Sequence, residues 1–124
     1  MGVKLSTGLR NHLLDTGSMK AALDGMVLRI YSGAVPGSPD DSLGSATLLT
    51  TISNNGTATG LTFATAAVAG VLQKESTEVW KGTNVAGGAH TFFRFETTAD
   101  DGSSSASAKR VQVTTGVVGA DLNL

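Results

Sequence analysis

Asp15 is the residue whose neighbours most suggest a catalytic role, because it lies in the motif LLDTGS at residues 13–18. An aspartate in such a motif can activate water when a second carboxylate, supplied by another subunit, shares its proton and splits the two pKa values. That chemistry requires the aspartate to follow a strand. The leucines before it instead recur at steps of four residues from Leu5, which is helical spacing. We therefore interpret Asp15 as the end of a helix, with Gly17 terminating it in a left-handed conformation.

The same motif is similar to the signature of aspartic proteases, whose small retroviral type is a homodimer. Residues 117–119, two valines before a glycine, loosely resemble the second element of that family. The segment before Asp15 is too short to build the hairpin that the protease aspartate follows. We keep a homodimeric aspartic protease acting through Asp15 as a remote alternative, and we predict no catalytic residue.

Patterns for metal and cofactor binding are weak in this sequence. His12 and His90 are the two histidines, and neither has a carboxylate at ligand spacing, so we expect no zinc site. The aspartate pairs at 40–41 and 100–101 offer oxygens to calcium from loops rich in Gly or Ser, but the further spaced ligands of a calcium loop are missing. We interpret both pairs as solvated turns. The sequence predicts no metal, no cofactor and no small-molecule substrate.

Aromatic and charged residues of the strands have more ordinary interpretations. Trp80, the single tryptophan, suggests a carbohydrate-binding β-sandwich as an alternative, but a large aromatic side chain more often fills a core or an interface. Arg94 and Glu96 lie two residues apart, which predicts a surface ion pair contributing about 0 to 1 kcal/mol. Phe93 and Phe95 lie on the opposite face, and we expect them to anchor the core.

Helical spacing is confined to residues 1–25, which we expect to form an N-terminal helical arm. Ser6 or Thr7 is placed to cap a first helix that ends near Asp15. Ser18 is placed to start a second, shorter helix. A helical piece of this length cannot bury its leucines alone, so the arm must dock on its own sandwich or on a neighbour.

Residues 26–124 are expected to form a β-sandwich domain, because alternation of apolar and polar residues begins at this point. Asn55-Gly56 indicates a type I′ hairpin turn, which requires positive φ at both positions. Segments 33–44 and 99–108 have the composition of surface loops. The predicted strands are Met26–Tyr31, Thr47–Ser53, Leu61–Val68, Val71–Lys74, Thr77–Lys81, His90–Thr97 and Arg110–Thr114.

Composition excludes several classes of protein. A chain of 124 residues fits one domain, and a net charge of -1 provides no basic field for nucleic acid. The chain has no cysteine for a disulfide framework and lacks the continuous apolar run of a membrane span. Its N-terminus lacks the apolar stretch of a signal peptide, so we expect synthesis in a cytoplasm.

Eight segments stand in this order along the chain: KLSTGLRNHLLDTGS, LRIYSG, LGSATLLTTIS, GLTFATAAVAGVLQK, EVWKGTNVAGG, TFFRFE, DDGSSS and GADLNL. In this order they resemble a family of small structural proteins of tailed bacteriophages that includes capsid cement, or decoration, proteins. The resemblance implies a mainly β fold, a jelly-roll-like antiparallel β-sandwich, that binds the outside of the assembled head as a symmetric oligomer. It implies no catalytic residues. The relatives continue past the segment matching GADLNL with further strand sequence.

We therefore expect a non-enzymatic virion protein, made in the host cytoplasm, that stabilises the capsid from outside by bridging subunits of the phage major capsid protein. We also expect it to associate with itself as a homodimer or homotrimer, and to bind neither nucleic acid nor membrane. A phage tail or head-completion protein is the alternative. Leu9→Asp and Leu13→Asp should impair assembly more than folding. The predicted capsid or oligomer interface is Leu5, Leu9, His12, Leu13, Leu14, Trp80, Leu122 and Leu124.

Overall fold

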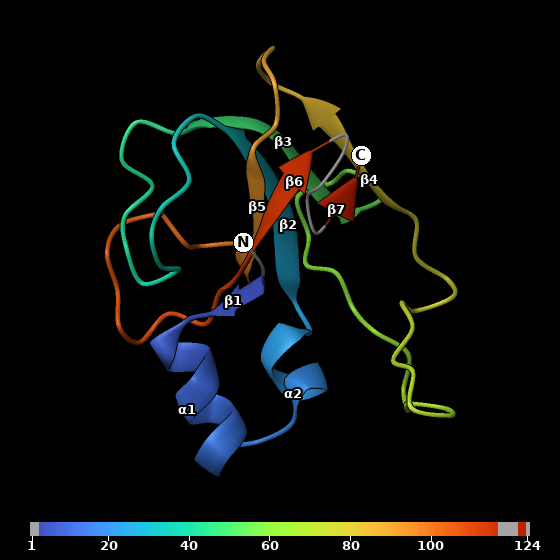
Figure 1. Ribbon diagram of the computed structural model, residues 1–124. Helices are drawn as coiled ribbons and strands as arrows, with labels where there is room; N and C mark the ends of the chain where they lie inside the picture. The colour runs from blue at the N-terminus through green and yellow to red at the C-terminus, as the bar shows by residue number, and fades with distance from the viewer. Residues whose placement is uncertain (1–2, 117–121, 124) are drawn as a thin grey trace.

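The computed structural model describes residues 3–116, 122 and 123. Among these residues, six antiparallel strands form one sheet in the order β1-β6-β5-β2-β3-β4, and β7 pairs in parallel with β6 (Figure 1). The chain is mainly β, with a β-sandwich-like body and a short N-terminal helical region, as the sequence predicts. The elements are β1 Val3–Leu5, α1 Thr7–Asp15, α2 Met19–Leu23, β2 Met26–Ser32, β3 Thr47–Asn54, β4 Trp80–Asn84, β5 Phe92–Thr97, β6 Val111–Gly116 and β7 Leu122–Asn123.

Serine side chains start both helices, which confirms the predicted caps. Ser6 Oγ accepts a hydrogen bond from the Leu9 N–H at 3.2 Å, and Ser18 Oγ accepts one from the Ala21 N–H at 3.1 Å. Each cap satisfies a donor that the first helical turn would otherwise leave free. Leu9 is fully buried within the chain, so α1 packs against other parts of its own chain.

Helix α1 ends differently from the prediction. Gly17 does not adopt a positive φ, and the N–H groups of Thr16 and Gly17 both donate to the carbonyl of His12. The ring of His12 lies close to Gly17, where an added Cβ would be 3.2 Å from its Nε2. Limited space beside His12, rather than a left-handed backbone, accounts for the glycine.

Strand β1 is not predicted by the sequence pattern. The four-residue spacing of leucines places Leu5 in the helix, but Ser6 caps α1 and therefore leaves Leu5 outside it. Leu5 instead pairs with Val111 in β6. The N-terminal region is thus joined to the sheet by main-chain pairing.

Segment 61–78 contains two predicted strands that the structure does not form. Two of the first backbone N–H groups of this segment donate hydrogen bonds to carboxylates instead of to a neighbouring strand. The Thr62 N–H donates to Glu78 Oε1 at 2.9 Å, and the Phe63 N–H donates to Asp24 Oδ1 at 2.8 Å. Because side chains satisfy these donors, the segment pairs through isolated bridges instead of a continuous ladder.

Farther along, the same segment folds back on itself as an irregular hairpin. Ala69 and Gly70, with φ of 52° and 77°, make its turn. Strand β4 then begins at Trp80, three residues later than the predicted strand 77–81. By contrast, Asn55 and Gly56 have φ of 55° and 70°, which confirms the predicted left-handed turn. The bridges in the irregular hairpin pair Phe63 with Lys74 and Val68 with Val71.

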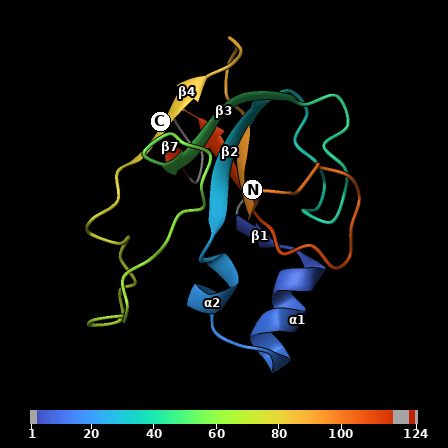
Figure 2. The same ribbon diagram turned by 180° about the vertical axis from the view of Figure 1, so that it is seen from behind.

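The sequence predicts that the face with Phe93 is buried and the face with Arg94 is exposed, but in the structure the Arg94 face is the more buried one. Arg94 and Glu96, expected at the surface, are 0% exposed. They lie on what we call the clamped face, over which loops 33–46 and 98–110 fold (Figures 1 and 2). Phe93 lies on the opposite, apolar face and is only half-buried. The loops supply hydrogen-bond acceptors, and this allows the polar face to be the buried one.

Candidate functional site

Arg29, Tyr31 and Glu96 form the first part of a buried ionic cluster on the clamped face. Arg29 donates to Glu96 Oε1 at 3.1 Å, and the Tyr31 hydroxyl donates to the same oxygen at 2.6 Å. Arg29 also donates to the carbonyls of Thr98 and Asp100, at 2.9 and 3.0 Å. Burial, and then the carboxylate of Glu96, raise the pKa of the Tyr31 hydroxyl. Tyr31 is therefore a neutral donor at physiological pH.

Arg110 and Asp100 form the second part. Two guanidinium nitrogens of Arg110 donate to the two oxygens of Asp100 at 2.6 and 2.7 Å, and both side chains are at least 96% buried. Burial alone would raise the pKa of Asp100, but hydrogen bonds from Arg110 and from the Gly102 N–H lower it below its usual range. The Asp100 carboxylate raises the pKa of Arg110 in return. This pair is charged and bidentate, the strong form of such contacts.

Arg94 and Gln112 form the third part, which fastens loop 33–46. Arg94 donates to the Gln112 side-chain oxygen and to the Asp41 carbonyl, each at 2.9 Å. Gln112 donates to the Pro36 carbonyl at 2.8 Å. Burial and then the charge of Arg110 lower the pKa of Arg94. Within the described chain, two buried side-chain polar atoms have no hydrogen-bond partner: Arg94 Nη1 and Glu96 Oε2.

Together these side chains hold two long loops to the sheet. Arg110 also takes part, because it donates to the carbonyls of Pro39 and Ser103, at 2.9 and 2.7 Å. We call Arg29, Arg94, Arg110 and Gln112 the carbonyl clamp, because each donates to main-chain carbonyls of a loop. Arg94, Arg110 and Gln112 are buried and the Arg29 side chain is only 16% exposed, so the loops are parts of the packed body rather than free surface segments.

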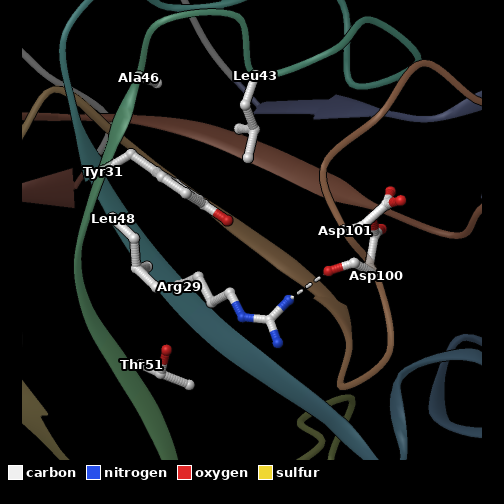
Figure 3. Close-up of a pocket in the computed structure, with 8 residues that line it drawn as sticks. All are labelled: Arg29, Tyr31, Leu43, Ala46, Leu48, Thr51, Asp100 and Asp101. Carbon is white, nitrogen blue, oxygen red and sulfur yellow. Dashed lines mark hydrogen bonds between the residues drawn. The ribbon is translucent and has the colours of Figure 1, made fainter.

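A pocket of about 350 Å³ opens beside the clamp. Figure 3 shows the Arg29 side chain reaching from β2 to the carbonyl of Asp100, with the Tyr31 hydroxyl nearby. The strongest polar groups at the pocket are already committed to partners in the chain, since Arg29 and Tyr31 both donate to Glu96. This arrangement stabilises the fold and leaves these two groups little freedom to bind a ligand. The lining residues are Arg29, Tyr31, Leu43, Ala46, Leu48, Thr51, Asp100 and Asp101.

The predicted interface residues that the structure describes separate into three groups by exposure. Leu9 is fully buried, so Leu9→Asp should impair folding at least as much as assembly, contrary to the expectation from the sequence. Leu14 is 84% exposed and remains available to a partner. Leu5, His12, Leu13 and Trp80 are half-buried. The side chain of Leu122, and the whole of Leu124, lie outside the described residues.

Trp80 is held from two sides. Its indole N–H donates to Glu78 Oε1 at 2.9 Å, and its ring meets Phe63 edge to face with centroids 5.4 Å apart. Phe63 also lies beside Phe95, with centroids 6.1 Å apart. The tryptophan therefore anchors the irregular segment to the apolar face of the sheet.

Asp15 lies at the end of α1, exposed, and accepts a hydrogen bond from the Thr16 hydroxyl at 2.8 Å. It is the last residue of a helix, as the leucine spacing predicts, and does not follow a strand. Among the described residues, no group of three His, Cys, Asp or Glu side chains is arranged to hold a metal ion.

Two aspartates interpreted as solvated turns have structural roles instead. Asp40 accepts hydrogen bonds from the N–H and the hydroxyl of Thr7, at 2.8 and 2.5 Å. Asp100 is the buried partner of Arg110. Thr7 opens helix α1, so Asp40 ties loop 33–46 to the helix. Asp40 and Asp100 do lie at turns, but the expectation that their side chains are solvated is wrong. Asp101 is exposed and bonds locally to Ser103.

Sequence reasoning missed the carbonyl clamp as a unit. Its signal was present: Arg94 and Gln112 alternate with apolar residues on strands that become neighbours, and two long polar loops flank them. Neither loop contains enough apolar surface to hold itself against a sheet. Long side chains that donate hydrogen bonds, such as those of Arg94 and Gln112, can therefore point from these strands toward the loops and hold them.

Comparison with known protein families, with curated proteins and with solved structures finds no significant match to this chain. In the described part of the chain, neither helix has the length and apolar character needed to traverse a bilayer.

Proposed function

We propose that this chain is a structural, non-enzymatic protein of a bacteriophage virion, a cement protein that binds the outside of the capsid and bridges major capsid subunits. The observation that carries the proposal is the position of three of its exposed large apolar side chains. Leu14 on α1 is 84% exposed, and Val68 and Val71 in the irregular hairpin are 74% and 53% exposed. We call these the two apolar tips.

The two tips project from one end of the molecule. Figures 1 and 2 show α1 and the irregular hairpin, the yellow-green segment, extending past the sheet at the same end from either view. Two separate contacts joined by a rigid body raise the effective concentration of the second contact once the first has formed. A protein that bridges neighbouring capsid subunits needs this arrangement, and it needs no deep pocket.

The carbonyl clamp supports the same proposal. A bridging protein transmits load between its contacts, so its connecting loops must not yield. Arg94 and Arg110 hold the two long loops by buried, charge-assisted hydrogen bonds, which are about twice as strong as neutral ones. The order of segments that resembles the cement-protein family agrees with this interpretation.

Sedimentation with phage heads tests the proposal. Purified wild-type protein should pellet with expanded heads in hundreds of copies per particle. Leu14→Asp and Val68→Asp should each weaken this binding about tenfold or more, because each removes the burial of one apolar side chain. Asn11→Asp and Thr65→Asp place the same charge at neighbouring exposed positions and should bind normally.

Two outcomes would overturn the proposal. One is wild-type protein that stays in the supernatant with expanded heads. The other is protein that sediments with tails or as a single ring at the head vertex, which would identify a tail or head-completion component instead.

A further inference from the structure

Strand β4 presents an open edge. It pairs with β3 on one side, and among the described residues no strand pairs with its other side. Figures 1 and 2 show β4 at the margin of the sheet. The opposite margin is β1, which has only three residues. Short edges are poor templates for pairing, whereas a five-residue edge can accept another strand.

The hydrogen bonds to β3 determine which backbone groups of β4 remain free. The Val85 N–H donates to the Leu49 carbonyl at 2.7 Å, and the Asn55 N–H donates to the Val79 carbonyl at 2.6 Å. In an antiparallel pair, alternate residues bond to a given neighbour. Odd-numbered residues of β4 therefore bond to β3. The backbone groups that point to the open side are those of Trp80, Gly82 and Asn84.

These free groups are self-complementary. If a second copy pairs antiparallel with β4 about a two-fold axis through Gly82, Trp80 of each copy lies opposite Asn84 of the other. All three outward-pointing residues then fall at hydrogen-bonded positions of the new ladder. The only charged residue of the strand, Lys81, lies opposite Thr83, so no like charges meet.

The same register explains two exposed valines that flank β4. Val79 and Val85 are 57% and 70% exposed, although β-branched side chains usually contribute to strands by packing on a neighbour. In the two-fold register, Val79 of one copy lies directly opposite Val85 of the other. Each copy thus buries both valines in cross-strand pairs.

We infer that the outer edge of β4 binds a second copy of this chain, in a two-fold antiparallel ladder centred on Gly82 that pairs Val79 with Val85 of the second copy. The dimer joins the two sheets into one. Its biological role rests on the proposed function, because a two-fold dimer doubles the number of apolar tips. The pairing itself rests on the strand edge alone, so it can fail while wild-type protein still pellets with heads.

Disulfide cross-linking tests the register, because the chain has no cysteine of its own. Val79→Cys and Val85→Cys proteins are mixed, oxidised mildly and run on a non-reducing gel. The mixture should give a covalent dimer, since opposite residues at a non-hydrogen-bonded position have Cα atoms about 4.5 Å apart. Each variant alone should not, because identical residues lie about 20 Å apart along the ladder.

Sedimentation velocity and light scattering test the association itself. Wild-type protein should have twice the mass of one chain at high concentration. Val79→Lys should raise the dimer dissociation constant at least tenfold, and mixing it with Val85→Glu should restore dimers by placing opposite charges across the ladder. Val35→Lys, at a valine that is 41% exposed in loop 33–46, is the matched control and should dimerise normally.

Three results would overturn this inference: a wild-type mass of one chain at every concentration, a mass of three chains, or equal cross-linking of each cysteine variant alone and of the mixture. Circular dichroism of every variant verifies that its fold is unchanged.

Discussion

Asp100 shows how much a single buried carboxylate can contribute in this protein. Both of its oxygens accept hydrogen bonds from Arg110, and Arg110 in turn holds carbonyls of two loops. Asp100→Asn should lower the free energy of unfolding at pH 7 by about 3 to 5 kcal/mol, because it leaves the buried arginine without its counter-charge. Chemical denaturation with urea would measure the loss as a shift of the unfolding midpoint.

The neighbouring aspartate provides the control. Asp101 is exposed and bonds only to Ser103, two residues away. Asp101→Asn makes the same chemical change and should leave the free energy of unfolding within about 0.5 kcal/mol of wild type. Similar losses for the two variants would show that burial of the Asp100–Arg110 pair is not what stabilises this region.

The charged residues also show where sequence reasoning reaches its limit at this scale. Alternation places Arg94 and Glu96 on one face and Phe93 and Phe95 on the other, and this is confirmed by the strand register. Alternation does not tell which face is covered. That depends on where two long loops fold. The loops are held through main-chain carbonyls that accept hydrogen bonds from distant side chains, and no local sequence pattern encodes these contacts.

At the scale of elements, helix α1 is positioned by a close approach to loop 106–108. An added Cβ on Gly8 would lie 2.3 Å from the Ser107 carbonyl oxygen. In an isolated helix, Gly→Ala is stabilising by about 1 kcal/mol. Here Gly8→Ala should destabilise the protein by about 1 to 3 kcal/mol, because the helix must move away from the loop. Thermal unfolding followed by circular dichroism would measure the change.

Gly87 provides the comparison for this substitution. A Cβ there would meet no atom within 4 Å, and its φ is not positive. Gly87→Ala should therefore change the free energy of unfolding by less than about 0.5 kcal/mol. An increase in stability for Gly8→Ala would mean that helix propensity, rather than the contact with Ser107, dominates at this position.

Elements with local signals are the ones that the sequence predicts. The caps at Ser6 and Ser18, the turn at Asn55 and the alternating strands depend on neighbours within a few residues, and the structure confirms them. Segment 61–78 has strand-like composition, yet two of its first backbone N–H groups donate to carboxylates that are 16 and 39 residues away in sequence. Long-range partners of this kind are invisible to periodicity. The candidate interface has the same limitation, because exposure of Leu14 and burial of Leu9 depend on how α1 docks.

At the scale of the whole molecule, buried or bonded carboxylates tie together segments that are far apart in sequence. Asp24 joins α2 to segment 61–78 and Asp40 joins loop 33–46 to α1, whereas Asp100 closes loop 98–110 on itself through Arg110. Thr7 hydrogen bonds lower the pKa of Asp40, opposed by burial. For Asp24, burial raises the pKa, but bonds from Lys20 and the Phe63 N–H outweigh it. All three carboxyls are thus more acidic than their ordinary value of 3.8.

These lowered pKa values give the molecule a defined response to acid. Below pH 3.8 the unfolded chain binds protons at these three aspartates before the folded chain does, so the free energy of unfolding falls as pH falls. We expect the melting temperature to be nearly constant from about pH 7 to 5 and to decrease steeply below about pH 4. A variant with Asn at all three positions should melt at a lower temperature at pH 7 and show a shallower decrease in acid. Melting curves recorded at each pH would test this, and a wild-type melting temperature that stays constant down to about pH 3 would show that the three carboxylates do not hold these segments together.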